Sequence, residues 1–95
     1  MMKPVDAVLL SPFHGKCLNI QTAVQCIIYL NNKNCKATRS NIYNCFSKNI
    51  YIRDAKRVLN KCIKYNYITS YVVKKRIRYF PTLIAYEKFG YLNIF

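Results

Sequence analysis

The sequence predicts a small α+β domain, mostly helical, in which a three-helix core is followed by a two-stranded β-hairpin and a short C-terminal helix. Three observations predict this class. Apolar residues recur with helical spacing in three successive segments. Residues 67–73 are then rich in β-branched and aromatic side chains, which favour a strand. The length of 95 residues and the apolar fraction of 53% suit one folded domain with one modest core.

An N-terminal arm over residues 1–18 precedes that core. Pro4 is expected in the first turn of a short helix over 4–10, and Ser11 and Pro12 should end that helix. We expect the arm to pack on the core or on a second copy of the chain.

The core is predicted over residues 19–66, and its first helix begins after Asn19, whose side chain can cap it. Apolar residues follow from Ile20 to Leu30 at helical spacing. The polar residues 31–34 should end this helix.

Two further helices complete the core. Thr38 can cap the second, over 39–46, and Asn49 can cap the third, which runs to Tyr65. Asn66 follows where a helix needs a residue in the left-handed conformation, which Asn adopts more readily than most residues. Two short helices joined by a brief turn, the second with a basic face, are typical of a helix-turn-helix.

Residues 67–81 are predicted to form the hairpin. Its tip is expected at Lys74, Lys75 and Arg76. Pro81 should end the returning strand, because proline has no N–H to donate to the partner strand.

The last segment, 82–95, is predicted as a short helix and an apolar tail. Thr82 can cap a helix over 83–89, and Gly90 is well placed to close it.

Positive charge is concentrated in residues 53–78. The chain carries 16 Lys and Arg against three Asp and Glu, for a formal net charge of +13, and nine of those cations lie in this stretch beside a single acid, Asp54. On the third helix, the cations fall opposite an apolar face centred on Ala55. A field of this sign favours polyanions: DNA, RNA or an acidic membrane surface.

The five cysteines are predicted mainly as free thiols. Cys26, Cys45 and Cys62 each lie on the apolar face of one core helix, where we expect them buried; a pair among them could alternatively form a disulfide. Cys17 and Cys35 lie outside the helices and should be more accessible.

Catalysis and metal binding have little support in the sequence, so we expect neither an enzyme nor a cofactor. Asp6, Asp54 and Glu87 are the only acids, and no two are paired. His14 and Cys17 do not have the spacing of a zinc site. No small-molecule ligand is evident.

No segment has the length and apolarity of a membrane span or a signal peptide. We therefore expect a cytoplasmic protein without membrane contact. Lys, Asn, Ile and Tyr are abundant, and their A/T-rich codons suggest an A/T-rich genome, viral or parasitic. If the source is viral, the protein is expected in the cytoplasm of a host cell.

Three segments carry a resemblance to a known family. Residues 37–42 resemble the opening of the positioning helix in winged-helix regulators, residues 58–68 the end of their recognition helix, and residues 78–82 the strand that closes the wing. The chain is similar, over about 37–90, to the MarR, ArsR and PadR groups and to small winged-helix proteins of archaeal viruses. It departs from them by having Asn66 where Gly is usual.

The resemblance implies a winged helix-turn-helix that binds double-stranded DNA and regulates transcription. We expect a homodimer as well, but the sequence lacks the long dimerisation helix of MarR-type proteins after Gly90, so the resemblance does not imply how two copies would pair. Residues 50–65 would be the recognition helix in the major groove, and the basic wing would lie on the minor groove or backbone. Arg and Asn are the side chains suited to guanine and adenine edges. The expected base-reading residues are Arg53, Arg57 and Asn60. The expected phosphate or minor-groove contacts are Arg39, Ser40, Asn41, Lys56, Lys61, Lys64, Lys74, Lys75, Arg76 and Arg78.

Two alternatives remain open. The first is a winged-helix module that docks on an acidic protein within a polymerase, replication or virion assembly. The second is an RNA or single-strand binder that stacks bases on its aromatic residues. We expect most hairpin aromatics to be core residues instead; they are Tyr65, Tyr67, Tyr71, Tyr79 and Phe80.

Overall fold

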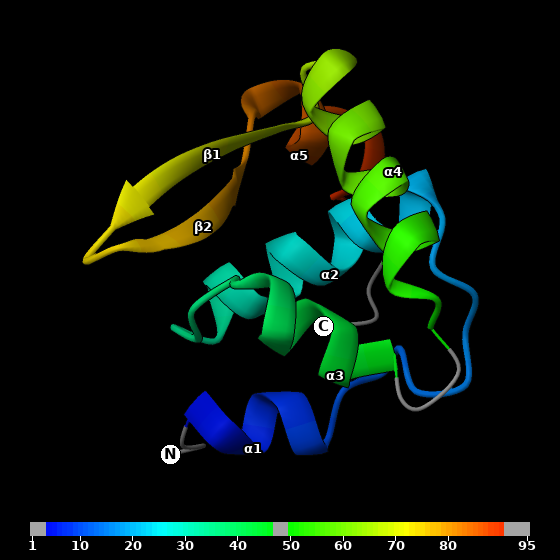
Figure 1. The fold of residues 1–95 in the computed structure, drawn as a ribbon, viewed down its shortest axis with the longest axis vertical. Coiled ribbons are helices and arrows are strands. Elements are labelled where there is room, and N and C mark those ends of the chain that lie inside the picture. The colour runs from blue at the N-terminus through cyan, green and yellow to red at the C-terminus, as the bar shows by residue number, and fades with distance from the viewer. Residues whose placement is uncertain (1–3, 47–49, 91–95) are drawn as a thin grey trace.

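The computed structural model describes residues 4–46 and 50–90, which form five helices and one antiparallel two-stranded sheet (Figure 1). This confirms the α+β, mostly helical class and the predicted order of elements. The elements are α1 (Pro4–Leu9), α2 (Ile20–Asn32), α3 (Arg39–Phe46), α4 (Ile52–Lys64), β1 (Ile68–Val73), β2 (Arg76–Pro81) and α5 (Leu83–Phe89).

Helix α2 is the centre of the core. Residues 23–30 are all buried, and α2 packs against α3, α4, α5 and β2. The N-terminal arm packs on this core too, since α1 lies against α3 and the Tyr29 hydroxyl donates a 2.6 Å hydrogen bond to the Ala7 carbonyl. Of the two positions expected for the arm, its own core or a second copy of the chain, the structure shows the first.

The predicted caps of three helices are present. Asn19 and Thr22 form a capping box in which each side chain bonds the other's backbone N–H at 2.9 Å. Thr38 accepts from the Asn41 N–H and Thr82 from the Ala85 N–H, both at 3.3 Å. Each hydroxyl or amide oxygen satisfies a backbone donor that the first helical turn leaves unpaired.

Helix α4 begins later than predicted. Its first residue is Ile52, and Tyr51 occupies the cap position with extended backbone and no side-chain cap bond. The proposed cap Asn49 lies outside the described residues. The end of α4 is as predicted, because Asn66 has φ 62 and the following Tyr67 N–H returns to the Cys62 carbonyl at 2.9 Å.

The hairpin turns on two residues instead of three. Val73 pairs with Arg76, so Arg76 belongs to β2, and the turn consists of Lys74 (φ 50) and Lys75 (φ 68). Two consecutive positive φ values define a type I′ turn, whose twist matches that of the flanking strands. A two-residue turn was not predicted here because its residues, Lys74 and Lys75, are neither Gly nor Asn.

Gly90 closes α5 as predicted, but without the left-handed conformation that is common for a glycine at a helix end. Its φ of −78 lies in the right-handed helical region, and its N–H donates to the Tyr86 carbonyl at 2.9 Å. A Cβ on Gly90 would press against that carbonyl oxygen. Close approach of the backbone, and not a left-handed conformation, therefore favours glycine here.

Among the described residues, no helix is long and apolar enough to cross a membrane.

Candidate nucleic-acid interface

The exposed side of α4 carries one continuous basic stripe. Ala55, Leu59 and Cys62 of α4 are buried, and the stripe lies opposite them because helix positions three and four apart share a face. Its members line a shallow hollow of about 420 Å³. They are Arg53, Lys56, Arg57, Asn60, Lys61 and Lys64, which we call the α4 surface. Five cations and one amide meet here, and none of the six is an acid.

These six side chains are available for a ligand. Every one is exposed, and within the part of the chain that the structure describes none makes a side-chain hydrogen bond. Asp54, the acid of the same helix, lines a different hollow and is off the stripe. The α4 surface therefore presents its charge to solvent without internal neutralisation.

A second basic surface joins the hairpin to the start of α3. The Tyr79 N–H donates to the Ala37 carbonyl at 2.9 Å, which holds the segment before α3 along the free edge of β2. A groove of about 290 Å³ results, which we call the wing groove. Its lining is Lys36, Thr38, Ser40, Asn41, Val73, Lys74, Arg76 and Arg78.

The wing groove unites residues that the sequence placed in separate groups. Ser40 and Asn41 were predicted contacts of α3, and Lys74, Arg76 and Arg78 were predicted contacts of the wing. Lys36 was missed, because it lies in a loop whose only structural signal is its pairing with β2. Lys75 is exposed at the turn and does not line the groove.

Two of the predicted contacts have bonds within the protein. The Arg39 Nε donates to the buried Tyr79 hydroxyl at 2.9 Å, and this bond raises the pKa of the Arg39 guanidinium. The Asn41 amide donates to the Lys36 carbonyl at 2.7 Å. These two bonds hold the start of α3 against β2 and against the segment that precedes α3.

The two basic surfaces diverge from a common root. Figure 1 shows the hairpin leaving the C-terminal end of α4 and extending away from that helix, with its tip far from α4. The tip lies instead over the start of α3, as the lining of the wing groove requires. A ligand that touches both surfaces must therefore be extended.

The hairpin aromatics divide between core and surface. Tyr79 is buried, and Tyr67 and Phe80 are half-buried, as expected. Tyr65 and Tyr71 are 53% and 58% exposed, so the expectation of a core position is wrong for these two. Tyr71 is exposed because the outer half of the hairpin extends beyond the body of the protein, whereas Tyr65 is exposed as the C-cap residue of α4.

All five cysteines are free thiols. Cys26 and Cys45 are buried; burial raises the pKa of Cys26, and the neighbouring Cys26 thiol lowers the pKa of Cys45. Cys62 is buried, and burial raises its pKa to about 11. Cys17 is exposed as predicted, but Cys35 is buried, because its N–H bonds the Leu30 carbonyl at the end of α2 and Ala37, two residues later, pairs with β2.

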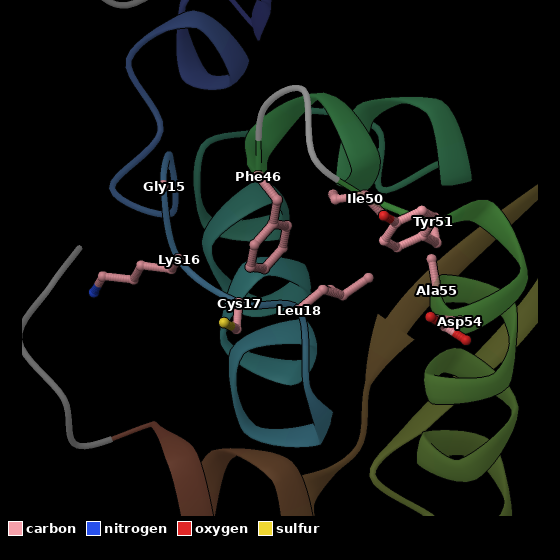
Figure 2. Close-up of a pocket in the computed structure, with 9 residues that line it drawn as sticks. All are labelled: Gly15, Lys16, Cys17, Leu18, Phe46, Ile50, Tyr51, Asp54 and Ala55. Carbon is pink, nitrogen blue, oxygen red and sulfur yellow. The ribbon is translucent and has the colours of Figure 1, made fainter.

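A hollow of about 370 Å³ at the amino end of α4 has no catalytic arrangement (Figure 2). It contains one carboxylate, Asp54, and one thiol, Cys17, and Figure 2 shows the Lys16 amine pointing away from both the cavity and Asp54. His14, outside this hollow, donates to the carbonyls of Val8 and Leu9. Among the described residues, no three His, Cys, Asp or Glu side chains gather as a metal site would require.

Comparison of the chain with protein-family models, with curated proteins and with solved structures gives no match. Its function is therefore inferred from the two basic surfaces themselves.

Proposed function

We propose that this protein binds double-stranded DNA as a winged helix-turn-helix, with α4 as the recognition helix and the hairpin as the wing. The observation that carries the proposal is the α4 surface, five exposed cations and an asparagine on one face of a helix. An α-helix of this width fits the major groove, where Arg and Asn can hydrogen-bond base edges.

The order of elements supports the finer fold. Helices α2, α3 and α4 precede a two-stranded hairpin, and the bond from the Tyr79 N–H to the Ala37 carbonyl ties the start of α3 to that hairpin. In a helix-turn-helix the second of the two helices enters the groove and the first crosses the backbone. Helices α4 and α3 would take these two roles.

The roles within the α4 surface follow from side-chain chemistry. Arg53 and Arg57 can each bond guanine O6 and N7, and Asn60 can bond adenine N6 and N7. Each good bidentate pair contributes about 1–3 kcal/mol of discrimination between bases. Lys56, Lys61 and Lys64 would neutralise phosphates, which increases affinity without selecting a sequence.

We further propose that the protein regulates transcription as a homodimer. The outer face of α5 supports this, because Leu83, Ile84 and Tyr86 are exposed there at 81%, 43% and 40%. Pairing of these faces would bury apolar side chains of an element that contributes no residue to the α4 surface. A dimer would then require a DNA site with two similar halves.

A comparison between two variants of equal charge tests DNA binding. Arg57→Gln with Lys61→Gln, and Lys16→Gln with Lys33→Gln, each lower the net charge of +13 by two, to +11. Fluorescence anisotropy with a labelled duplex over a salt series measures the affinity. We expect the first pair to lower the affinity and to reduce the slope of log affinity against log salt by about 0.9, for the one phosphate contact that Lys61 loses.

The Lys16 and Lys33 pair should leave the slope nearly unchanged. Equal slopes in both variants would contradict the proposal, because DNA would then respond to the total charge and not to the α4 surface.

A further inference from the structure

The hairpin has two faces with different chemistry. Successive side chains of a strand point to opposite faces, so the pairs Ser70–Tyr79 and Val72–Ile77 share the inner face, on which Tyr79 is buried. The pair Tyr71–Arg78 lies on the outer face, together with Phe80 and Arg76. This outer face continues onto the wing groove, which both arginines line.

An aromatic pair forms the centre of the outer face. The rings of Tyr71 and Phe80 lie 5.7 Å apart at 60°, an edge-to-face arrangement that fixes the Tyr71 ring in position. Tyr71 is nevertheless 58% exposed, while Phe80 is half-buried beneath it. A large ring that is oriented by a neighbour and open to solvent is suited to stacking on a nucleobase.

Cations and hollows lie on the Phe80 side of this pair. The wing groove of about 290 Å³ adjoins a second hollow of about 200 Å³ that Phe80 lines, and the two share Lys36 and Arg78. The lining of the two hollows includes four cations and no carboxylate. Aromatic rings beside cations that can follow a phosphate chain are the two features by which proteins hold unpaired strands.

We propose that the outer face of the hairpin binds an unpaired DNA strand, with Tyr71 stacked on a base and Lys36, Arg76 and Arg78 on the phosphates. A blunt duplex has no unpaired base on which Tyr71 could stack. The outer face would therefore bind an unpaired strand, whereas the α4 surface would bind a duplex. Binding of a single strand to the outer face does not depend on the proposed function. Only the expectation that this strand lies next to a duplex bound by α4 rests on the proposed function.

The absence of tryptophan from the chain permits a direct test. Tyr71→Trp introduces a single indole on the outer face, and Leu10→Trp introduces one just after α1, where Leu10 is 67% exposed. Titration with a thymidine oligomer should quench the indole at position 71 and leave that at position 10 unchanged. No quenching in either variant, or equal quenching in both, would overturn the proposal.

A second measurement uses the natural aromatic residue and does not depend on an introduced indole. We expect a duplex with a single-stranded overhang to bind the unaltered protein about tenfold more tightly than the blunt duplex, the gain from stacking one or two bases. Tyr71→Ala should lose this gain but retain the affinity for the blunt duplex, and Tyr71→Phe should keep both. Equal affinity of the unaltered protein for the two duplexes would contradict the proposal.

The same experiments separate this inference from the proposed function. The Arg57→Gln and Lys61→Gln variant should lose duplex affinity while the thymidine oligomer still quenches an indole at position 71. If duplex binding fails in every variant and that quenching remains, the single-strand surface stands alone. If the oligomer does not quench the indole at position 71 but the Arg57→Gln and Lys61→Gln variant loses duplex affinity, only the proposed function stands.

Discussion

Arg39 illustrates how one side chain can differ from its sequence-based role. A cation at the start of a helix suggests a phosphate contact, yet its Nε donates to the Tyr79 hydroxyl across 40 positions of sequence. The sequence contains no signal for this bond, because it depends on how the hairpin returns past α3. Asn66 is the opposite case, since its left-handed conformation was predictable from local chemistry alone.

Asn66 offers a prediction about stability. At φ 62, Asn66→Ala should lower the free energy of unfolding by about 1 kcal/mol, because a Cβ without a polar side chain is disfavoured in the left-handed region. Asn66→Gly should leave it unchanged or raise it. Urea denaturation measures both. Asn60→Ala, at an ordinary position of α4, is the control and should have little effect; equal loss at positions 60 and 66 would exclude this explanation.

The thiols should react in an order set by exposure and pKa. Cys17 is exposed and should be alkylated by iodoacetamide first, while buried Cys26, Cys45 and Cys62 should react only on unfolding. Mass spectrometry of the native protein with time would show one early modification. Early labelling of Cys62 would contradict its burial.

The raised pKa of Cys62 predicts that the free energy of unfolding depends on pH. Its folded pKa of about 11 exceeds the ordinary value of 9.0, so between these values the unfolded thiol ionises while the folded thiol stays neutral. The contribution to stability is full below pH 9 and falls as the pH rises toward 11. Urea denaturation at pH 8 and pH 10 should show a smaller loss of stability in Cys62→Ala than in the unaltered protein. An equal loss would show that Cys62 is not responsible.

At the scale of elements, the hairpin turn is an unfavourable local structure, because Lys74 and Lys75 are the only described residues with positive φ that are neither Gly nor Asn. Lysine at two consecutive positive φ values is disfavoured, and Asn-Gly is the preferred pair in a type I′ turn. A turn that retains two lysines under this strain suggests a role for their charge.

Replacing this turn separates stability from binding. Lys74→Asn with Lys75→Gly should raise the free energy of unfolding by about 1 kcal/mol, because the new residues adopt positive φ at less cost. It should also weaken duplex binding and reduce the salt slope by about 1 to 2, because two cations leave the wing tip. Thermal unfolding and anisotropy measure the two effects. A more stable variant with unchanged binding would show that the tip does not contact DNA.

The elements that the sequence predicted well are those with strong local signals. Apolar periodicity located α2, α3 and α4, and the caps Asn19, Thr38 and Thr82 were visible from residue type. The start of α4 was not, since Tyr51 has no capping side chain. The two-residue turn was missed because its chemistry is atypical.

At the scale of the whole molecule, the sequence indicated the total positive charge but not its division between the α4 surface and the wing groove. The α4 stripe was predictable, because helical spacing alone places its members on one face. The wing groove was not, because Lys36 and Arg78 meet only through the pairing of Ala37 with β2. The divergence of the hairpin from α4 likewise depends on tertiary packing.

This division has a consequence for binding. Two separated basic surfaces suit an extended polyanion better than a compact anion, which could occupy only one of them. Affinity should therefore increase with the length of the duplex until both surfaces are covered and then level off.

The most direct measurement is a map of backbone amide shifts in isotope-labelled protein on titration with a duplex. We predict that the largest changes lie in residues 52–64, with a second group in 36–41 and 73–78, and that α1 and α5 change little. Changes concentrated in α1 or α5, with residues 52–64 unaffected, would contradict the assignment of α4 as the DNA-binding helix.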